Sequence, residues 1–424
     1  MLIKELARKG FWTLSARIFG AMGVLFMIIL YARILGVSDF GLFSLGMVVL
    51  NILGVIARWG TDQVILKKVG IHWEENPGVS KGYVFGALKV VLIVSAISSI
   101  LLFWNHYWVA NSLFRKPELS LVLFYLSFFI TPLSVSYTVA ESIKAIGRPV
   151  LSTFLQNLIT PFVAILLGIS LWLVDEGNLV SLIMAYGVGV ITSLMLGVVA
   201  WKREFDSFKS VIVPIKRIMI EGWPMLLITS GSLLMAWTDI LVLGALSTKD
   251  GLGVYSAASR VVMVTSLLLV AINSITSPKY AKLYSSGDIS GLLELAQASS
   301  KLLFILSFLP TSFLLLFPEW VLKWFGDGFE AGSGVLVILA VGQFVNVSFG
   351  SVGYLLIMTG NELKMRKIIL YTSFINIILS LLFFGIFDVL GVALSTMLCT
   401  VLWNIWALKV LQKELNFTFL KLWR

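Results

Sequence analysis

Long apolar runs, each about the length of a membrane-crossing helix, follow one another along almost the whole chain. A helix needs about 20 mostly apolar residues to cross the ~30 Å hydrocarbon core of a bilayer. The runs lie at residues 11–35, 42–66, 82–104, 119–143, 150–173, 179–201, 221–246, 254–277, 298–317, 333–358, 368–387 and 390–411. The pattern therefore predicts an all-α integral membrane protein with twelve transmembrane helices.

The basic residues between these runs predict the orientation of the helices. The segments on the side away from the N-terminus carry only Arg33, Arg115, Lys116, Lys249 and Lys323. Four bases remain after the segments on both sides have been counted, namely Arg17, Arg58, Lys89 and Arg260. All other lysines and arginines lie on the side of the N-terminus. Because cytoplasmic loops carry an excess of Lys and Arg, both termini are expected in the cytoplasm. The net charge of +10 is then a signal of topology, and no nucleic-acid partner is expected.

The chain is expected to consist of two related halves. The sequence ILGVSDFGLFS at residues 34–44 is echoed by VLG and LGVYS within residues 242–256. The longest cytoplasmic connection, residues 202–217, lies between the sixth and seventh runs. We therefore expect an N-terminal six-helix lobe at 1–201, a cytoplasmic linker at 202–217 and a C-terminal six-helix lobe at 218–424. Two such bundles are typical of transporters that work by alternating access.

Other residues argue against an enzyme, a metal centre or a cofactor. The single cysteine, Cys399, lies in an apolar run, so no intramolecular disulfide or thiolate cluster can form. His72 and His106 both lie outside the predicted spans, on opposite sides of the membrane. An integral-membrane glycan polymerase or acyltransferase needs a catalytic constellation at one membrane face, and none is evident.

Charges inside the predicted spans are costly. Each central Arg, Lys or Asp costs about 2.5–3.5 kcal/mol on insertion scales, so these groups must face each other, a wet cavity or the bundle interior. Arg58 and Asp62 are four residues apart on one helix and could form an ion pair. Asp239 and Arg260 lie at matching depths in consecutive runs and could also pair.

The remaining charged and polar residues leave two alternatives open. Lys89 is a candidate for cavity lining, although we favour that it reaches the cytoplasmic interface. Arg17 has small neighbours that suggest a cavity or a close helix contact. Glu141 and Glu221 lie near cytoplasmic ends and can reach the headgroups. The further candidates for cavity lining are Asn157, Asn346 and Asn376, each of which could equally form an interhelical hydrogen bond.

The sum of the intramembrane charges favours an anionic ligand. Four bases face two acids, Asp62 and Asp239, and a cavity with this balance has a positive potential. Arginine suits phosphate because its guanidinium can bind two oxygens at once. The two aspartates are candidates for coupling to H⁺ or Na⁺.

Several segments resemble polysaccharide-type flippases of the multidrug/oligosaccharidyl-lipid/polysaccharide exporter superfamily. They are ARILGVSDFGLF at 32–43, DILVLG with GVYSAASR within 239–260, SPKYAKLYSSGD at 277–288 and GVALST at 391–396. The resemblance implies a V-shaped pair of six-helix lobes in the cell membrane. It also implies that Arg17, Arg58 and Arg260, in the first, second and eighth spans, bind pyrophosphate. The related lipid II flippases have two further helices, so this chain is not expected to be one of them.

The resulting hypothesis is a flippase that moves a polyprenyl-pyrophosphate-linked oligosaccharide from the cytoplasmic to the outer leaflet. Its expected partners are the lipid-linked oligosaccharide, membrane lipids, a coupling cation and the polysaccharide polymerase or assembly machinery. One alternative is a cation-coupled drug or metabolite antiporter of the same superfamily, which predicts an acidic cavity. A non-transporting scaffold leaves the intramembrane bases unexplained.

Overall fold

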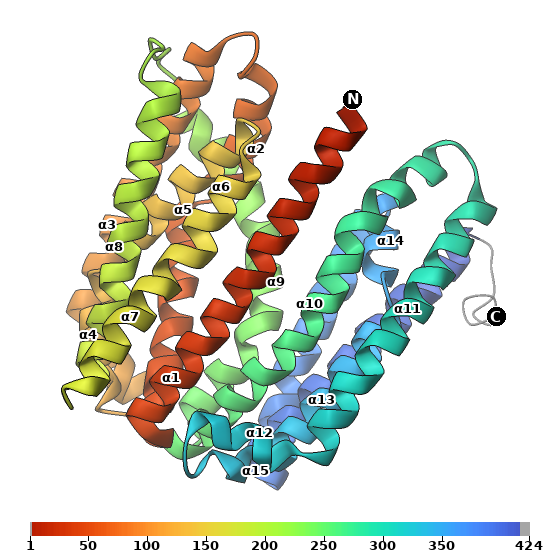
Figure 1. Ribbon diagram of the computed structural model, residues 1–424. Coiled ribbons are helices and arrows are strands. Elements are labelled where there is room, and N and C mark those ends of the chain that lie inside the picture. The colour runs from red at the N-terminus through yellow and green to blue at the C-terminus, as the bar shows by residue number, and fades with distance from the viewer. Residues whose placement is uncertain (1, 416–424) are drawn as a thin grey trace. The chain divides into compact units, whose positions relative to one another are not determined.

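The computed structural model describes residues 2–415, and every regular element in that range is a helix (Figure 1). Contacts within the chain divide it into two compact units, Met1–Leu233 and Leu234–Arg424. The division falls inside one long helix, α9 (Ile215–Leu246), whose first half packs with the first unit. The two units are described separately below.

The first unit contains eight further α-helices and two short π-helical segments among the described residues. They are α1 (Leu2–Arg58), α2 (Thr61–His72), α3 (Pro77–Trp108), η1 (Val109–Leu113), α4 (Leu119–Ser127), α5 (Ile130–Ala145), α6 (Pro149–Phe154), η2 (Leu155–Ile159), α7 (Thr160–Leu173) and α8 (Leu179–Phe205). A buried apolar core that includes Val64, Val84 and Ile143 joins α2, α3 and α5.

α1 holds two of the predicted runs in one element. A straight helix of 57 residues would be about 86 Å long, far more than a bilayer needs. The helix is interrupted at Gly36, where φ is 70° and ψ is 178°. A glycine adopts this conformation without the steric cost that a Cβ would add. The kink therefore separates residues 11–35 from residues 42–66, as the apolar pattern predicts.

Two other predicted spans of the first unit are irregular. The run at 119–143 forms α4 and α5, which are bent by 49° at residues 128–129. Pro132 follows this bend, and its ring cannot donate a backbone hydrogen bond to the preceding turn. The run at 150–173 forms α6, η2 and α7 in sequence, and η2 contains Gln156 and Asn157. π-Helical turns inside α-helices often mark functional sites.

The second unit is built from the end of α9 and the helices that follow it. They are α10 (Lys249–Ser285), α11 (Ile289–Leu316), α12 (Pro318–Leu322), η3 (Lys323–Phe325), η4 (Phe329–Gly332), α13 (Ser333–Ser348), α14 (Val352–Met358) and α15 (Glu362–Leu415). α15 is interrupted at Asp388, which has φ 51°, and so also holds two predicted runs. α13 and α14 together cover the run at 333–358 and are separated at Gly350, which has φ 70°.

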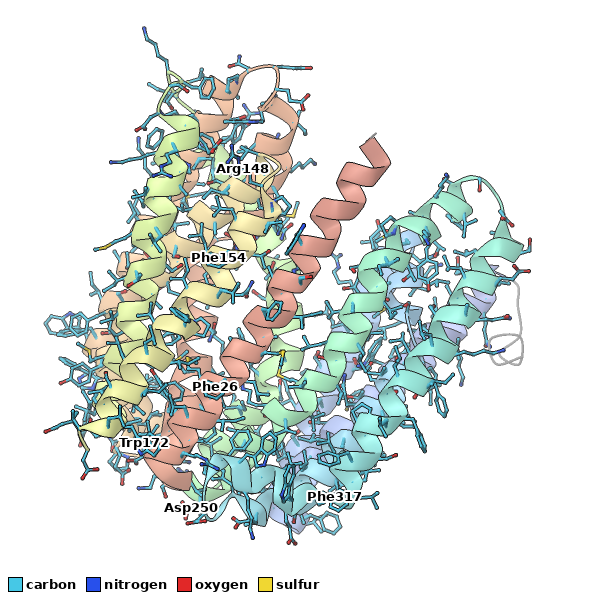
Figure 2. The ribbon with its side chains drawn as sticks, viewed as in Figure 1. Phe26, Arg148, Phe154, Trp172, Asp250 and Phe317 are labelled. Atoms are coloured by element: carbon cyan, nitrogen blue, oxygen red, sulfur yellow. The ribbon has the colours of Figure 1, made fainter. Side chains whose placement is uncertain are left out.

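The described helices are long and apolar enough for a multi-pass membrane protein. Eight of them could cross a membrane, or nine if the bent pair α4 and α5 forms one span. Large apolar side chains are exposed along them, as lipid contact requires, among them Leu309 at 77% and Leu316 at 72%. Figure 2 shows Arg148 and Trp172 toward opposite ends of the first unit.

Candidate functional site

A break in the helix places Arg58 and Asp62 beside each other. The predicted run at 42–66 is interrupted after Arg58, where Trp59 has φ 50° and Gly60 has φ 71°. Left-handed backbone is costly for a bulky residue such as Trp59, by about 1–3 kcal/mol. The Thr61 hydroxyl donates to the Arg58 carbonyl oxygen at 2.7 Å and satisfies one carbonyl left free at the end of α1.

Arg58 and Asp62 form the ion pair that their spacing suggests. The Arg58 Nε donates to the Asp62 Oδ2 at 2.7 Å, and the two side chains are 13% and 22% exposed. The Arg58 guanidinium carbon also lies 4.7 Å from the centre of the Tyr137 ring on α5. The two terminal amino groups of Arg58 donate no hydrogen bond to any described residue, so most of its N–H donors are available to a ligand.

Glu141 belongs to this cluster, which corrects an expectation from the sequence. From its position in the sequence it can reach the headgroups, but its side chain is only 12% exposed. Its carboxylate accepts from Lys144 at 3.0 Å and from Gln156 of η2 at 3.0 Å. The charges of this cluster are therefore two acids, Asp62 and Glu141, and two bases, Arg58 and Lys144, so it lacks the positive excess that the sequence predicts. Glu221 is half-buried and pairs with Lys68 and Arg217.

Arg17, Lys89 and Asn157 do not join this cluster through any contact among the described residues. Arg17 on α1 and Lys89 on α3 are both exposed, and neither forms an ion pair or hydrogen bond with a described residue. Asn157 donates to the Thr153 carbonyl oxygen at 3.3 Å. A Cβ added to Gly20 of α1 would lie 2.7 Å from the Asn157 Cβ, so these helices are in close contact one turn beyond Arg17.

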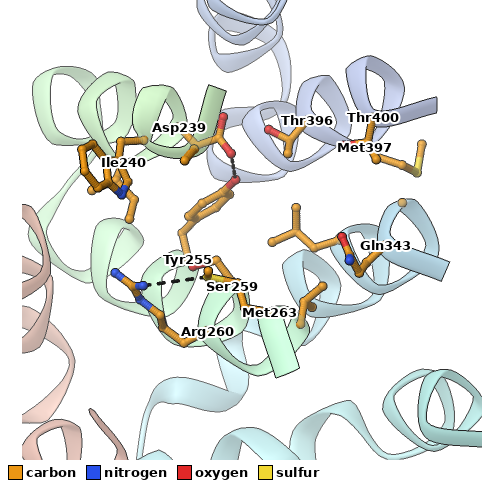
Figure 3. A pocket seen from close by; sticks show the side chains of 15 residues that line it. Asp239, Ile240, Tyr255, Ser259, Arg260, Met263, Gln343, Thr396, Met397 and Thr400 are labelled. Atoms are coloured by element: carbon orange, nitrogen blue, oxygen red, sulfur yellow. Dashed lines mark hydrogen bonds between the residues drawn. The ribbon is translucent and has the colours of Figure 1, made fainter. Parts of the chain in front are cut away.

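The second unit contains a cavity of about 260 Å³. It lies between the end of α9, α10, α13 and α15, and Figure 3 shows its lining. Asp239, Tyr255, Arg260, Gln343 and Thr396 are its chemically distinctive residues. The volume suits water, an ion or a small polar group, and is too small for an oligosaccharide.

Asp239 is held by neutral donors rather than by Arg260. The Tyr255 hydroxyl donates to its Oδ2 at 2.6 Å (Figure 3), and Asn376 Nδ2 donates to its Oδ1 at 3.0 Å. Ser395 in turn donates to the Asn376 Oδ1 at 2.7 Å. The suggested ion pair between Asp239 and Arg260 is absent from the described part of the chain.

Arg260 lines the same cavity, and its guanidinium makes few contacts with described residues. Its side chain is half-buried, and its Nη1 lies 3.8 Å from the Met263 sulfur. No described carboxylate forms an ion pair with it. Asp239 is therefore a buried acid with no protein cation beside it, and such a group must be neutralised by a proton or balanced by a bound cation.

Asn346 lies away from this network. It accepts from Asn404 Nδ2 at 2.9 Å and donates to Gln343 at 3.4 Å, so it joins α13 to α15. Nothing in the sequence marks Tyr137, Gln156 or Tyr255 as functional, although Tyr255 lies in the GVYSAASR segment. A buried tyrosine usually finds a hydrogen-bond partner, but only the helix pairing shows that this partner is Asp239. No group of three His, Cys, Asp or Glu residues that could hold a metal occurs in residues 2–415.

The fold is that of transporters of the multidrug/oligosaccharidyl-lipid/polysaccharide exporter superfamily. The structure is similar to that of the lipid II flippase MurJ in an inward closed conformation, with a TM-score of 0.77, 15% identity, and coverage of 96% of this chain and 88% of that one. It is also similar to a multidrug resistance MATE family transporter of the MOP superfamily in an inward-facing conformation, with a TM-score of 0.73, 17% identity, and coverage of 96% and 98%.

The sequence comparison assigns the chain to a family. Residues 6–283 match the polysaccharide biosynthesis protein family, and the chain belongs to that family. It is 26% identical over 404 residues to the probable low-salt glycan biosynthesis flippase Agl15 of Haloferax volcanii, a match that covers 93% of this chain and 81% of the relative. These relatives are flippases and transporters rather than enzymes, which confirms the expectation that the chain is not an enzyme.

Proposed function

We propose that the protein flips a polyprenyl-pyrophosphate-linked oligosaccharide from the cytoplasmic to the outer leaflet of the cell membrane. The observation that carries the proposal is Arg58, a largely buried guanidinium in a membrane-spanning unit with unused N–H donors. Such donors fit the oxygens of a pyrophosphate. The similarity to proteins named as a glycan biosynthesis flippase and a lipid II flippase supports the same substrate class.

Arg260 and Arg17 are proposed as further phosphate ligands. Arg260 offers a guanidinium with no described acidic partner, at a cavity of the second unit. Arg17 is an exposed base on α1, and no described residue pairs with it. Lys89, Asn157 and Asn346 remain candidates for lining the transport route. Asn376 has a clearer role, since it holds Asp239.

Twelve spans in two lobes are proposed as the transport architecture. The kinks at Gly36 and Asp388 each divide one long helix into two lengths suited to a bilayer. We count each half of α1 and α15 as one span, the bent pair α4 and α5 as one span, and the 32-residue α9 as one span. With the other long helices, this count gives the proposed twelve spans. We retain lobes at 1–201 and 218–424, with a linker at 202–217, and propose alternating access between them.

Asp239 is the better of the two candidates for coupling to a cation. Its carboxylate accepts from two neutral donors, Tyr255 and Asn376, and the Thr396 hydroxyl lines the same cavity. A carboxylate can take a proton, and carboxylate and hydroxyl oxygens are hard ligands that suit Na⁺. Asp62 already balances Arg58, so a cation there would compete with an existing ion pair.

A cation-coupled antiporter of drugs or metabolites is the second candidate. The burial of Asp239 at the cavity favours this function, because a buried acid can also bind a cationic substrate. The similarity in fold to a MATE transporter is consistent with it. The two functions differ in the charge of the ligand, because the free N–H donors of Arg58 and Arg260 suit an anion, whereas Asp239 suits a cation.

The experiment that tests the proposed function measures the leaflet in which the lipid-linked glycan lies. Pyrophosphate-linked lipids are labelled from outside in cells with and without the protein. We expect these lipids to accumulate in the cytoplasmic leaflet when the protein is absent. An unchanged distribution, together with altered drug or metabolite export, would favour the antiporter.

A further inference from the structure

The Arg58–Asp62 ion pair spans a break in the backbone. Arg58 is the last residue of α1, and Asp62 lies in the first turn of α2. Between them, Trp59 and Gly60 both have left-handed backbone, with φ of 50° and 71°. In a continuous helix, a pair with this spacing adds to an existing ladder of hydrogen bonds. Here it joins two separate helix ends, so it fixes the angle between them.

The first half of α9 holds the other side of the break. The Trp59 indole donates to the Met219 carbonyl oxygen at 3.2 Å, and its ring centre lies 5.3 Å from that of Trp223. Gly60 and Gly222 pack so closely that a Cβ on either one would clash with the backbone of the other segment. The break is thus held by packing and a hydrogen bond with α9, by the Thr61 hydroxyl on the Arg58 carbonyl oxygen and by one ion pair. Of these contacts, only the ion pair is open to competition from an anion.

We propose that the Arg58–Asp62 ion pair is a latch across the Trp59–Gly60 break, and that a phosphate bound at Arg58 opens it. The inference rests on the proposed function, because it takes Arg58 as a phosphate ligand. Asp62 occupies the Nε edge of the guanidinium, which is one of the edges that bind an oxyanion with two parallel hydrogen bonds. Phosphate that reaches the free terminal amino groups competes with Asp62 for the same guanidinium, and at the Nε edge it takes the place of the carboxylate. Asp62 is then a positioning residue that holds Arg58 until the substrate arrives.

The groups around Asp62 favour its release once Arg58 is taken. Its Oδ1 is buried and accepts no hydrogen bond from a described residue. Glu141 of α5 repels it, while Lys144 attracts it more weakly than Arg58 does. Tyr137 lies over the guanidinium and continues to hold Arg58 in place. Loss of the ion pair therefore frees the start of α2 and leaves Arg58 where it is.

The first arm of the test needs no ligand. Hydrogen–deuterium exchange is measured for peptides covering residues 56–66 in the purified full-length protein. In Asp62→Asn we expect exchange to be about tenfold faster than in the wild type, since local opening is no longer opposed by the ion pair. Arg217→Gln is the matched control: Arg217 and Glu221 have the same spacing within the uninterrupted α9, and Arg217 is 58% exposed. Equal exchange in Asp62→Asn and the wild type would overturn the latch.

A double variant with the two charges exchanged keeps the test decisive if the single variant misfolds. The double variant Arg58→Asp and Asp62→Arg restores an ion pair across the break with its direction reversed. We expect it to regain the slow exchange of the wild type. Fast exchange in a double variant that folds, as judged by its elution and helix content, would also overturn the latch.

The second arm uses inorganic pyrophosphate as the probe. We expect saturating pyrophosphate to speed exchange at residues 56–66 in the wild type, and to have no effect there in Asp62→Asn or the double variant. If pyrophosphate binds and Arg58→Ala abolishes the binding, but exchange at the break does not change, the latch is wrong and the phosphate site stands. If the wild type binds no pyrophosphate, the role proposed for Arg58 fails, and opening by phosphate fails with it.

Discussion

The hydroxyl of Tyr255 donates to the carboxylate of Asp239 at 2.6 Å and joins α10 to α9 inside the second unit. The two residues lie on consecutive helices, and both are buried at the cavity that Arg260 also lines. A tyrosine that donates to a buried acid can stabilise its charge without neutralising it. The carboxylate thus remains able to take a proton or a small cation from the cavity.

Replacing Tyr255 with Phe should change the dependence of transport on a cation. The hydrogen bond stabilises the free carboxylate by about 1.5–3 kcal/mol, so its loss favours the proton- or cation-bound form, and we expect the cation concentration for half-maximal transport to fall roughly tenfold. Asp239→Asn should abolish the dependence on the gradient altogether. The measurement is substrate movement in proteoliposomes at graded Na⁺ and pH. Tyr354→Phe, at an exposed tyrosine of α14, serves as the control. Full gradient dependence in Asp239→Asn would rule out a coupling role.

Gly222 should not tolerate a larger side chain. An added Cβ would meet the Trp59 carbonyl oxygen of the facing backbone, which cannot move aside as a flexible side chain can. We expect Gly222→Ala to destabilise the protein by about 1–3 kcal/mol, the usual cost of overpacking. Gly385→Ala is the control, because a Cβ there meets nothing within 4 Å. Thermal unfolding of the purified protein measures both. Equal unfolding temperatures for the two variants would contradict the close approach of α9 to the break.

Asp288 should titrate at unusually low pH. Its carboxylate accepts from the Gly291 amide at 2.8 Å and from the Ser290 hydroxyl at 2.9 Å, and these hydrogen bonds lower its pKa. The group lies before α11 and outside the membrane-spanning segments. Because the folded pKa is below the ordinary value of about 3.9, its stabilising effect is complete above that value and is lost as pH falls through the lowered one.

The Gly291 amide resonance reports this titration in ¹⁵N-glycine-labelled protein. We expect its midpoint to lie below about 3.9, the ordinary value for an aspartate. Asp288→Asn keeps the cap, because asparagine is also a good N-cap residue, but should show no such midpoint. A wild-type midpoint at or above the ordinary value would show that the cap does not favour the charged carboxylate.

The apolar runs and the spacing of charges predict much of this structure. Hydrophobic length alone identifies residues 11–35 and 42–66 as separate crossings, and the kink at Gly36 separates them. The four-residue spacing of Arg58 and Asp62 predicts their ion pair. Both features depend on local sequence, because helix geometry turns a spacing in the chain into a distance in space.

The features that depend on tertiary packing could not be read in the same way. The residues next to Trp59 in the sequence do not predict the break there. The left-handed backbone of Trp59 is held by a contact with α9, about 160 residues further along the chain. The burial of Glu141 depends on Gln156 of η2. Depth matching suggested Arg260 as the partner of Asp239, but depth gives no information about which face of a helix a side chain occupies. The neutral donors Tyr255 and Asn376 take that place.

The most direct test of the proposed function follows a lipid-linked saccharide across a membrane. The purified protein is reconstituted with a fluorescent polyprenyl-pyrophosphate disaccharide, and a quencher that cannot cross the bilayer reports the leaflet of the label. The wild type should carry the label across. Arg58→Ala should be at least about tenfold slower, because one charge-assisted contact of 1.5–3 kcal/mol is lost. Arg148→Gln, at a surface ion pair with Glu204, should keep the wild-type rate. Movement of the label by Arg58→Ala at the wild-type rate would contradict the pyrophosphate assignment.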